Sequence, residues 1–409
     1  MKITMLAGYY APEKSADTHL NVDLAESFSR LGAEVTVLVP FPSRGIDDKE
    51  QAAYLSRRDE RVSDTLRILR VGEPAVYHKS LLRRGLALLK KSMALYRAAR
   101  RTQTDAYFIV STPPFLGYFG ALLSKRAPVV YLLHDVFPDS LALSGKLREG
   151  SVPMRALHRV ERWMYRRLTH IDPCSEDIKT TLLSRGVPAE KLTVVSNWAD
   201  PDECVGVARS DNPLFDRYGL SRDWFYVSYG GNLGHLQNAE TILRAAQRLQ
   251  SVPAIRFALI GDGARAQALR EQCREMALQN VDWLPLQSDV SAVYSFGDVE
   301  LVSLKAGVTR IAMPSKTWSI LSAARPVICE AERNSGLVRL LEQLGCGVGV
   351  EPGDDAALAD AVLALYRLDA AQRERMGAAG REYICSHLNR EQATRAHFDV
   401  LERMIKERT

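Results

Sequence analysis

Short runs of apolar and β-branched residues alternate with amphipathic helical stretches along the whole chain, and this alternation limits the possible folds. Five buried strands are predicted first, at residues 3–7, 34–39, 106–110, 129–133 and 192–196. Six more follow, at residues 225–229, 256–260, 281–285, 299–302, 326–329 and 347–350. Strands that alternate with helices form parallel sheets covered on both faces. The sequence therefore predicts an α/β protein with two doubly wound domains.

The two strand series are separated by residues 199–212, which contain Asp, Pro and Gly without periodicity and are typical of a linker. We place one domain at residues 1–203 and the second at residues 204–387. A final helix with mixed polar and apolar faces is predicted at residues 388–409. A chain of 409 residues is long enough for each domain to bury its own core.

Composition excludes several other classes of protein. The six cysteines form no Cys-x-x-Cys pair, which excludes a zinc ribbon or a disulfide scaffold and favours a reducing compartment. No run approaches the ~20 apolar residues of a membrane-spanning helix. The apolar start before Gly8 is too short for a signal peptide, so we expect a cytoplasmic protein. A net charge of +5 is no argument for nucleic-acid binding.

Ligands bind beyond the carboxyl ends of strands in open parallel sheets, so the loops there hold the candidate site. Residues 230–234 (Gly-Gly-Asn-Leu-Gly) and 260–263 (Ile-Gly-Asp-Gly) follow two successive strands, and their backbone N–H groups can face an anion. Pro314 is predicted to begin a helix, with Ser315 and Lys316 in its first turn. Such a terminus suits a diphosphate, although a solvated lysine at an ordinary helix start is the alternative.

The first strand series offers weaker candidates. Gly8 follows the first strand and permits close approach of a ligand, but a plain turn into a helix explains it equally well. His134 and Asp135 end an apolar strand. A histidine there is more often a satisfied core residue than a catalyst, and the aspartate serves equally well as a helix cap.

Together these motifs resemble a known family. Residues 230–234, 260–263 and 314–321 (Pro-Ser-Lys-Thr-Trp-Ser-Ile-Leu) are similar to the donor domain of family 4 glycosyltransferases, which have the GT-B fold. The resemblance covers nearly the whole chain and is strongest to bacterial surface-polysaccharide transferases of the colanic-acid and L-N-acetylfucosamine type. Residues 9–13 (Tyr-Tyr-Ala-Pro-Glu) resemble the start of those enzymes. The resemblance implies two Rossmann-like domains that face each other across a cleft, with the final helix crossing back to the first domain.

The resemblance also implies the reaction. The chain would transfer a sugar, L-N-acetylfucosamine or L-fucose, from a nucleotide-diphosphate donor, with UDP favoured over GDP. The acceptor would be an undecaprenyl-diphosphate-linked saccharide in surface polysaccharide, O-antigen or capsule biosynthesis. Configuration would be retained, and no metal or other cofactor is expected.

Residue roles follow from the same resemblance. His134 would position the donor sugar, and Lys316 would stabilise the departing diphosphate. The donor-binding set is Gly231, Asn232, Gly261, Asp262, Gly263, Leu286, Arg310, Ser315, Lys316 and Ser319. The acceptor-binding set is Gly8, Tyr9, Glu13 and Asp135.

One departure from the family leaves alternatives open. Most family 4 enzymes carry two glutamates eight positions apart, where this chain has Ile311 and Ser319. A sugar-nucleotide epimerase of the same fold, or an inactive nucleotide-sugar-binding scaffold, therefore stays possible.

Residues 78–101 contain eight Lys and Arg residues and no acid, with apolar residues on another helical face. This pattern predicts a helix that lies on an anionic membrane surface, and a solvated outer helix is the alternative. The predicted membrane contacts are Lys79, Arg83, Arg84, Lys90, Lys91 and Arg97. A similar cluster comprises Arg155, Arg159, Arg162, Arg166 and Arg167. We expect a peripheral protein on the cytoplasmic face of the inner membrane, and no nucleic-acid partner.

Overall fold

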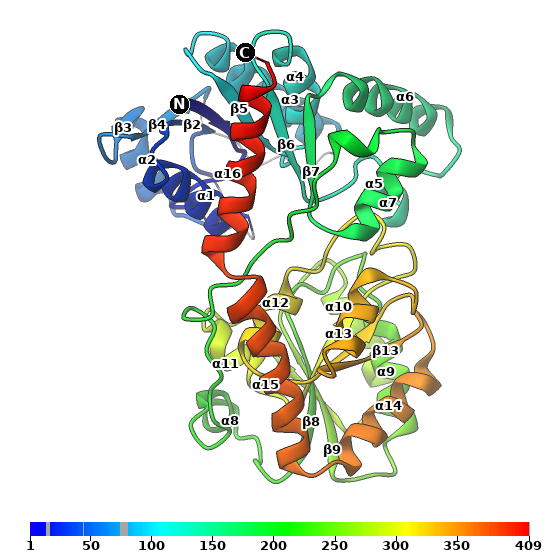
Figure 1. Cartoon of the computed structure of the whole chain (residues 1–409). Helices are drawn as coiled ribbons and strands as arrows, with labels where there is room; N and C mark the ends of the chain where they lie inside the picture. The colour runs from blue at the N-terminus through cyan, green and yellow to red at the C-terminus, as the bar shows by residue number, and fades with distance from the viewer. Residues whose placement is uncertain (14–16, 44, 74–80, 409) are drawn as a thin grey trace. The chain divides into compact units, whose positions relative to one another are not determined.

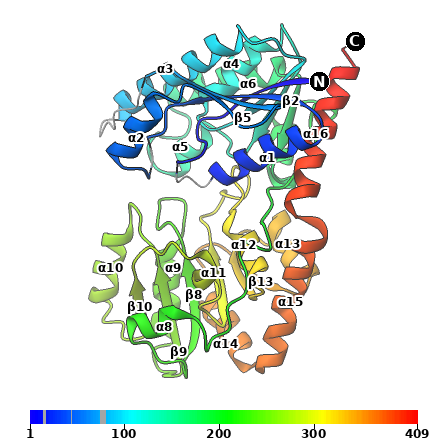
Figure 2. The same ribbon diagram turned by 90° about the vertical axis from the view of Figure 1, so that its left-hand side faces the viewer.

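The computed structural model describes residues 1–13, 17–43, 45–73 and 81–408, and all their side chains except those of Asp48, Leu81, Leu82 and Arg84. The chain forms two compact units, each built around its own sheet (Figures 1 and 2). Unit 1 comprises Met1–Pro138, Arg148–Asn197 and Arg390–Thr409, and unit 2 comprises Asp139–Leu147 and Trp198–Asn389. The predicted α/β class with two Rossmann-like domains is confirmed.

Unit 1 contains a seven-stranded sheet in the order β3-β4-β2-β1-β5-β6-β7. The strands are β1 (Lys2–Leu6), β2 (Glu34–Pro40), β3 (Asp59–Arg61), β4 (Leu66–Val71), β5 (Ala106–Val110), β6 (Val129–Leu133) and β7 (His170–Pro173). All neighbours are parallel except the edge pair β3 and β4. Every residue of β5 and β6 is buried, as expected for strands covered on both faces.

The helices of unit 1 are α1 (Thr18–Arg30), α2 (Asp48–Leu55), α3 (Leu81–Ala99), α4 (Phe115–Leu123), α6 (Val152–Arg167), α7 (Glu176–Ser184) and α16 (Arg390–Lys406), with a 3₁₀ turn η1 at Ala189–Lys191. The C-terminal helix α16, red in Figure 1, lies beside α1. Its Thr394 hydroxyl is 2.7 Å from that of Ser27, and His397 Nδ1 is 2.7 Å from an Asp172 carboxylate oxygen on β7. The predicted return of the final helix to the first domain is confirmed.

Unit 2 contains a six-stranded parallel sheet in the order β10-β9-β8-β11-β12-β13. The strands are β8 (Phe225–Gly230), β9 (Ile255–Ile260), β10 (Val281–Leu284), β11 (Val299–Ser303), β12 (Val327–Glu330) and β13 (Gly347–Val350). The helices are α5 (Asp139–Leu143), α8 (Pro213–Tyr218), α9 (Ala239–Arg248), α10 (Ala266–Glu275), α11 (Val290–Tyr294), α12 (Lys316–Ser322), α13 (Gly336–Gln343), α14 (Asp355–Arg367) and α15 (Ala370–His387).

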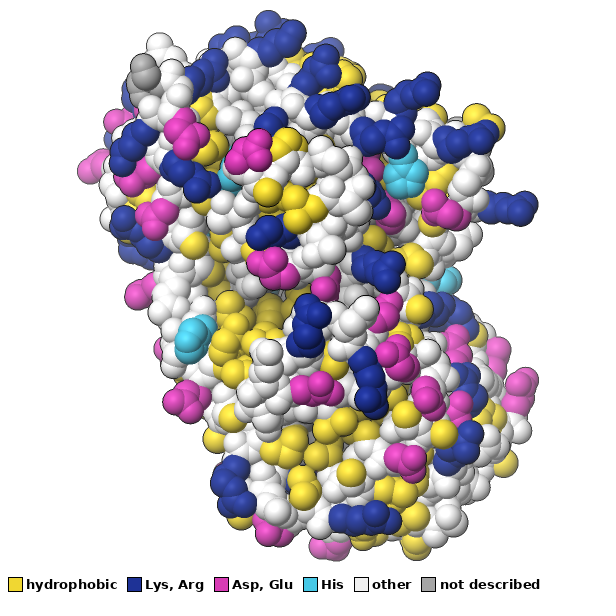
Figure 3. Space-filling view, turned by 45° about the vertical axis from the view of Figure 1, so that its right-hand side comes forward, with side chains coloured by type: hydrophobic (Ala, Val, Ile, Leu, Met, Phe, Trp, Pro, Cys, Tyr) yellow, Lys and Arg dark blue, Asp and Glu magenta, His cyan; other side chains and the backbone are white. Residues whose placement is uncertain are grey.

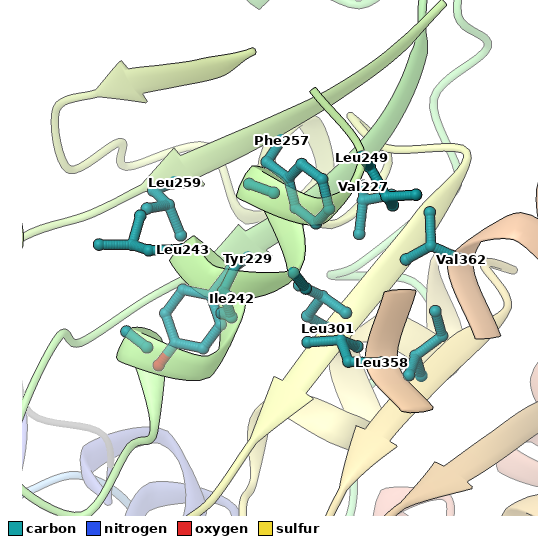
Figure 4. Close-up of a cluster of buried hydrophobic side chains, with 14 of the residues drawn as sticks. Val227, Tyr229, Ile242, Leu243, Leu249, Phe257, Leu259, Leu301, Leu358 and Val362 are labelled. Atoms are coloured by element: carbon teal, nitrogen blue, oxygen red, sulfur yellow. The ribbon is translucent and has the colours of Figure 1, made fainter. Parts of the chain in front are cut away.

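Alternate residues of the central strands of unit 2 build its largest apolar core (Figure 4). The strand residues Val227, Tyr229, Phe257, Leu259 and Leu301 pack against Ile242 and Leu243 of α9 and against Leu358 and Val362 of α14. The side chains of one strand alternate between the two faces of the sheet, so this pattern fixes the register of β8, β9 and β11. It therefore also fixes where their carboxyl ends, and the loops that follow, lie.

The division between the units differs from the predicted boundary after residue 203. It falls at Asn197–Trp198, because Trp198 is buried and Ala199 belongs to an apolar cluster of unit 2. Residues 139–147 also belong to unit 2, since Leu143 packs against the same cluster. Composition marked the irregular part of the linker but gave no sign of these apolar anchors.

The prediction of a strand at residues 192–196 is wrong. This segment forms only an isolated bridge, from Leu192 to Ile171, along the edge strand β7. The pattern missed β7 because His170 and Asp172 interrupt its apolar run. The other ten predicted strands agree with the structure to within one residue at each end.

Candidate functional site

The candidate donor site lies at the carboxyl edge of the sheet in unit 2. The strand order reverses between β8 and β11, and in open α/β sheets ligands bind at such a switch point. The first glycine loop follows β8, and the second follows the neighbouring strand β9. Both loops therefore flank the place where a ligand is expected.

The two glycine loops pack directly on each other. The amide of Gly231 donates to the carbonyl of Ile260 at 2.8 Å, and that of Leu233 donates to the carbonyl of Asp262 at 2.9 Å. A Cβ atom on Gly261 would lie 2.0 Å from the carbonyl oxygen of Gly231. The predicted convergence of the loops is therefore present. The missing side chain of Gly261 makes room for the chain itself rather than for a ligand.

Fewer loop amides are free than the glycine pattern suggests. The amides of Gly231, Leu233, Gly234, Gly261 and Gly263 all donate to oxygens of the protein. Within the described chain, the amides of Asn232 and Asp262 donate to no acceptor. Both residues are exposed at the loop tips. An anion at this edge would therefore meet two free loop amides rather than a full cradle.

Lys316 joins the loops from the segment that follows β11. Its Nζ lies 3.5 Å from the centre of the Tyr229 ring, and a Cβ atom on Gly231 would be 3.4 Å from that Nζ. Gly231 has a φ of 121°, a conformation that residues with a side chain rarely adopt. The third predicted segment thus meets the first glycine loop, and Gly231 leaves the space that the lysine fills.

The helix that carries Lys316 begins two residues later than predicted. Helix α12 starts at Lys316, with Ser315 at the N-cap and Pro314 before it. The amides of Thr317 and Trp318 donate three residues back, to Pro314 and Ser315, which marks a tight turn rather than a helical one. Helix α12 has only seven residues, so we assign the positive potential here to the lysine charge.

The amino group of Lys316 is buried and has no hydrogen-bond partner among the described residues. Burial lowers the pKa of Lys316 to about 7, although the negative charge of Glu300 acts in the opposite direction. A buried cation without an oxygen ligand is unfavourable, because it has lost its hydration. An anion that reached this group would restore the missing contacts, so the amino group is well placed to bind one.

The remaining donor candidates are spread around this centre. Arg310 and Ser315 are exposed, and Gly263 belongs to the second glycine loop. Leu286 is 68% exposed and follows the edge strand β10, two strands away from β8. Ser319 lies within α12, where its carbonyl accepts a hydrogen bond from the Cys204 thiol at 3.2 Å. The structure thus joins the glycine loops to Lys316 but gives no such link for Leu286.

Glu300 was missed by the sequence analysis. It lies within β11 and is fully buried, and burial raises its pKa. The signal was available, because Glu300 is the one acid within a predicted buried strand of residues 299–302. A charged residue at such a position is almost never buried without a reason.

In unit 1, His134 follows β6 directly. Its amide donates to the hydroxyl of Ser111 at 3.0 Å, and its Nε2 is buried without a partner in the described residues. Burial lowers the pKa of His134, which keeps the imidazole neutral near pH 7. The neighbouring Asp135 is exposed. A neutral imidazole can donate or accept a hydrogen bond but is a weak base.

Two of the predicted acceptor residues have structural roles. A Cβ atom on Gly8 would lie 2.4 Å from the Pro113 ring, so this glycine allows the loops after β1 and β5 to pack. Glu13 is buried and accepts a hydrogen bond from the amide of Ser43 at 2.8 Å. We therefore remove Glu13 from the acceptor candidates. Tyr9 is partly buried, and its carbonyl accepts a hydrogen bond from the Asn21 side chain.

Comparison with known proteins identifies the family. Residues 21–198 match the glycosyl transferase 4-like domain, and residues 225–367 match the glycosyl transferases group 1 domain. WbjE of Pseudomonas aeruginosa, described as a probable glycosyltransferase, is 31% identical over 310 residues, which are 71% of this chain and 73% of WbjE. This chain is a family 4 glycosyltransferase. The resemblance drawn from the motifs is confirmed, and the chain is an enzyme of the transferase class.

A second relative points to the same biosynthetic setting. WcaI of Escherichia coli K12, a glycosyl transferase assigned by name to colanic acid biosynthesis, is 28% identical over 370 residues. These cover 88% of the glycosyltransferase and 90% of WcaI. The enzyme therefore belongs with the surface-polysaccharide transferases.

Solved structures confirm the GT-B fold. Sucrose-phosphate synthase of Thermosynechococcus elongatus matches with a TM-score of 0.77 and 16% identity over 99% of each chain. HepE of Anabaena, in complex with UDP, matches with a TM-score of 0.71 over 98% of this chain and all of HepE, at 16% identity. WaaG, a transferase of lipopolysaccharide biosynthesis, matches with a TM-score of 0.69 and 13% identity over 98% and 99% of the two chains. At these identities the likeness concerns the fold alone.

The glycosyltransferase has a basic surface on unit 1, formed by helices α3, α4 and α6. Tyr96 of α3 stacks on Phe119 of α4, and Tyr118 of α4 stacks on Trp163 of α6, so the three helices form one continuous layer. Its exposed basic residues are Arg83, Lys90, Arg97, Arg155, Arg159, Arg162, Arg166 and Arg167. Figure 3 shows Lys and Arg side chains gathered over unit 1. We call this layer the α3–α4–α6 surface.

The α3–α4–α6 surface combines this charge with exposed apolar groups. Leu86 is 51% exposed, Val152 is 68% exposed and Val160 is 46% exposed. The single acid in the three helices, Glu161, is buried and paired with Arg185 at 2.6 Å. The surface that these helices present to solvent is therefore cationic and partly apolar.

Three predicted membrane contacts need comment. The prediction that Lys91 contacts the membrane is wrong, because this residue is partly buried and its amino group donates to the hydroxyl of Ser43 at 3.4 Å. Burial also lowers the pKa of Lys91. Lys79 and the side chain of Arg84 lie outside the described residues.

Among the described residues, no helix is both long enough and apolar enough to cross a bilayer.

Proposed function

We propose that the enzyme transfers a sugar from a nucleoside-diphosphate donor, held by unit 2, with retention of configuration. The observation that carries this proposal is the buried amino group of Lys316, which lies beside the first glycine loop and has no hydrogen-bond partner among the described residues. A diphosphate would supply the oxygen atoms that this cation lacks. The free amides of Asn232 and Asp262 would add hydrogen bonds at the same edge of the sheet.

The proposed chemistry uses the leaving group as the base. The anomeric C–O bond to the diphosphate breaks, and the acceptor oxygen forms its new bond on the same face of the sugar. The departing phosphate oxygen takes the acceptor proton. Lys316 and the loop amides stabilise the negative charge that grows on the diphosphate. Such electrostatic stabilisation is usually the largest single contribution to the rate of catalysis.

Front-face attack fits the residues at the two glutamate positions of the family. Ile311 is buried and apolar, and Ser319 has a hydroxyl in place of a carboxylate. Neither position therefore offers a carboxylate that could form a covalent intermediate with the sugar. We assign His134 a hydrogen-bonding role toward the transferred sugar, because burial keeps its imidazole neutral.

For the donor we propose UDP ahead of GDP, with no metal ion. The complexes of HepE with UDP and with UDP-glucose support this choice, since that protein shares the fold. The name of WcaI supports an acceptor in surface-polysaccharide assembly. We propose an undecaprenyl-diphosphate-linked saccharide as the acceptor and L-N-acetylfucosamine or L-fucose as the sugar.

The affinity for UDP is expected to fall as the pH rises above 7. The pKa of Lys316 is about 7 in the free enzyme, and a bound diphosphate raises it. Binding is therefore tightest where the free lysine is already protonated. Above pH 7 the complex must take up a proton, so affinity falls by up to about tenfold per pH unit. Titration calorimetry between pH 6 and 9, with a chelator present, measures this slope.

The Lys316→Met variant is the control for that slope, because it removes the titrating group and should bind weakly with little dependence on pH. GDP, titrated in parallel, tests the preference for UDP. Failure of the wild-type enzyme to bind either nucleotide would contradict the proposed function.

We further propose that the enzyme acts as a peripheral protein on the cytoplasmic face of the inner membrane, bound through the α3–α4–α6 surface. Basic residues with exposed apolar neighbours are typical of contacts with anionic lipid. Each basic residue near such a surface contributes about 1 kcal/mol. A lipid-linked acceptor would also be presented at this surface.

Replacing Arg83, Lys90 and Arg97 together with glutamine is expected to weaken binding to anionic liposomes by roughly 100-fold at low salt, since three contributions of about 1 kcal/mol are lost. Flotation with phosphatidylglycerol vesicles measures the bound fraction. The matched control replaces Arg274, Arg339 and Arg367, three exposed arginines of unit 2, and should bind like the wild type. Equal losses in both triple variants would show that only net charge matters, and the surface assignment would then be withdrawn.

A further inference from the structure

A cavity of about 520 Å³ lies at the amino edge of the unit 2 sheet. The strands of this sheet are parallel, so the segments that precede them lie at the opposite edge from the two glycine loops. The cavity is therefore separate from the candidate donor site. Four segments line it: residues 206–209 of the linker, residues 295–298 before β11, residues 323–326 before β12, and residues 370, 373 and 374 of α15.

The walls of this cavity are largely apolar. The apolar residues of the lining include Val207, Phe296, Ala323, Ala324 and Pro326. Pockets that bind small molecules typically measure about 300–1,000 Å³ and combine apolar walls with a few well-placed polar groups. The size and the walls of the cavity therefore suit a small molecule with an apolar part.

The charged residues of the lining leave an excess of positive charge. They are Arg209, Arg325, Arg373, Asp298 and Glu374. Arg209 and Asp298 compensate each other, because they form an ion pair at 2.7 Å. Among the described residues, no carboxylate lies within ion-pair distance of Arg325 or Arg373. Glu374 is exposed, so solvent screens its charge.

Arg325 is held in place by the walls of the cavity. Its Nη2 donates to the carbonyls of Val207 at 2.9 Å and of Ser295 at 3.1 Å, while its Nη1 donates to no acceptor in the described chain. Arg373 is fixed in a similar way, since its Nη1 donates to backbone carbonyls. A guanidinium with free N–H groups binds carboxylate or phosphate oxygens through charge-assisted hydrogen bonds. Both arginines can therefore anchor an anion.

We propose that this cavity is a second ligand site of the enzyme, which binds a small organic molecule that joins an oxyanion group to an apolar body. The oxyanion accepts hydrogen bonds from Arg325 and Arg373, and the apolar body contacts the walls. The inference does not depend on the proposed function, because no residue of the donor site lines the cavity.

Phenyl phosphate is the probe for this site, because it joins an oxyanion to an apolar ring. Its affinity is measured by ligand-observed NMR, and its location by the Nε–H signal of Arg325 in enzyme labelled with ¹⁵N-arginine. The signal is assigned by its loss in Arg325→Met. We expect a saturable shift of this signal, with an affinity about tenfold or more above that of inorganic phosphate, since the ring buries apolar surface. A signal that phenyl phosphate leaves unshifted would overturn the inference.

Arg325→Met is expected to weaken the binding of phenyl phosphate by about tenfold or more, the effect of losing a charge-assisted hydrogen-bonding group. Arg339→Met, which removes an exposed arginine of unit 2 outside the cavity, is the matched control and should bind like the wild type. Ala370→Phe serves if Arg325→Met fails to fold. It keeps every arginine, but its ring fills the cavity from an exposed position of the lining and should abolish binding. Wild-type affinity in Ala370→Phe would contradict the proposed site.

Lys316→Met separates this cavity from the donor site, which also offers a cation to a phosphate group. Binding of phenyl phosphate that persists in Lys316→Met and falls in Arg325→Met supports the second site. The opposite pattern would show that the probe occupies the donor site, and the inference would be withdrawn. If phenyl phosphate shifts the Arg325 signal but neither UDP nor GDP binds the wild type, the second site stands and the donor assignment fails.

Discussion

Replacing Lys316 with methionine is expected to lower kcat/KM for sugar transfer by about 10²–10³-fold, the usual cost of losing one group that stabilises developing negative charge. Methionine fills a similar volume but offers the departing diphosphate neither a charge nor a hydrogen bond. The amino group of Lys316 has no hydrogen-bond partner among the described residues, so its loss breaks none of the hydrogen bonds that the structure records. Release of UDP from a UDP-sugar donor, followed by chromatography, measures the rate.

The fold of the Lys316→Met variant should survive. Removing a buried cation relieves a desolvation cost, which offsets the lost contact with the Tyr229 ring. We therefore expect the free energy of unfolding to change by no more than about 1 kcal/mol. Lys146→Met, an exposed lysine of unit 2, is the matched control and should retain full activity. Wild-type rates in Lys316→Met would refute the role given to this lysine.

The second large effect is expected from Gly261→Ala, which should lower the free energy of unfolding of unit 2 by about 2–4 kcal/mol, as overpacking of rigid groups does. The new Cβ atom would lie 2.0 Å from the carbonyl oxygen of Gly231 and 2.9 Å from its carbonyl carbon. Both are backbone atoms, so no flexible side chain can move aside. The two loops must separate, and affinity for UDP should fall with the fold. Urea denaturation and calorimetry measure the two effects.

Gly85→Ala is the control for the chemical change itself. Gly85 lies inside α3, and nothing lies within 4 Å of the position of its Cβ atom. Alanine is favoured over glycine in a helix interior by about 0.5–1 kcal/mol, so this variant should be slightly more stable. A Gly261→Ala enzyme with unchanged stability and UDP affinity would mean that the close packing of the two loops is not required.

The strands and the glycine loops could be predicted because they depend on local pattern. Apolar runs such as β5 and β6 are buried at every position, and their composition alone indicates this. β7 could not be found in this way. Its Asp172 is buried because His397 of α16 contacts it, and these residues are 225 positions apart in the chain. Only the fold brings that partner to the strand.

The donor site was predicted in its parts but not in its contacts. The sequence placed Lys316 and the two glycine loops at strand ends, and the structure joins them. The sequence could not reveal that Gly261 makes room for the backbone of Gly231. Nor could it reveal that most loop amides already donate hydrogen bonds within the protein. Lys91 illustrates the same limit, because the face of α3 that is buried depends on the elements it packs against.

A crystal structure of the enzyme with UDP tests the central claim most directly. The account predicts that the diphosphate lies against the first glycine loop, with an oxygen atom within hydrogen-bond distance of Lys316 Nζ. A diphosphate bound away from Lys316, with the amino group still unpartnered, would contradict it.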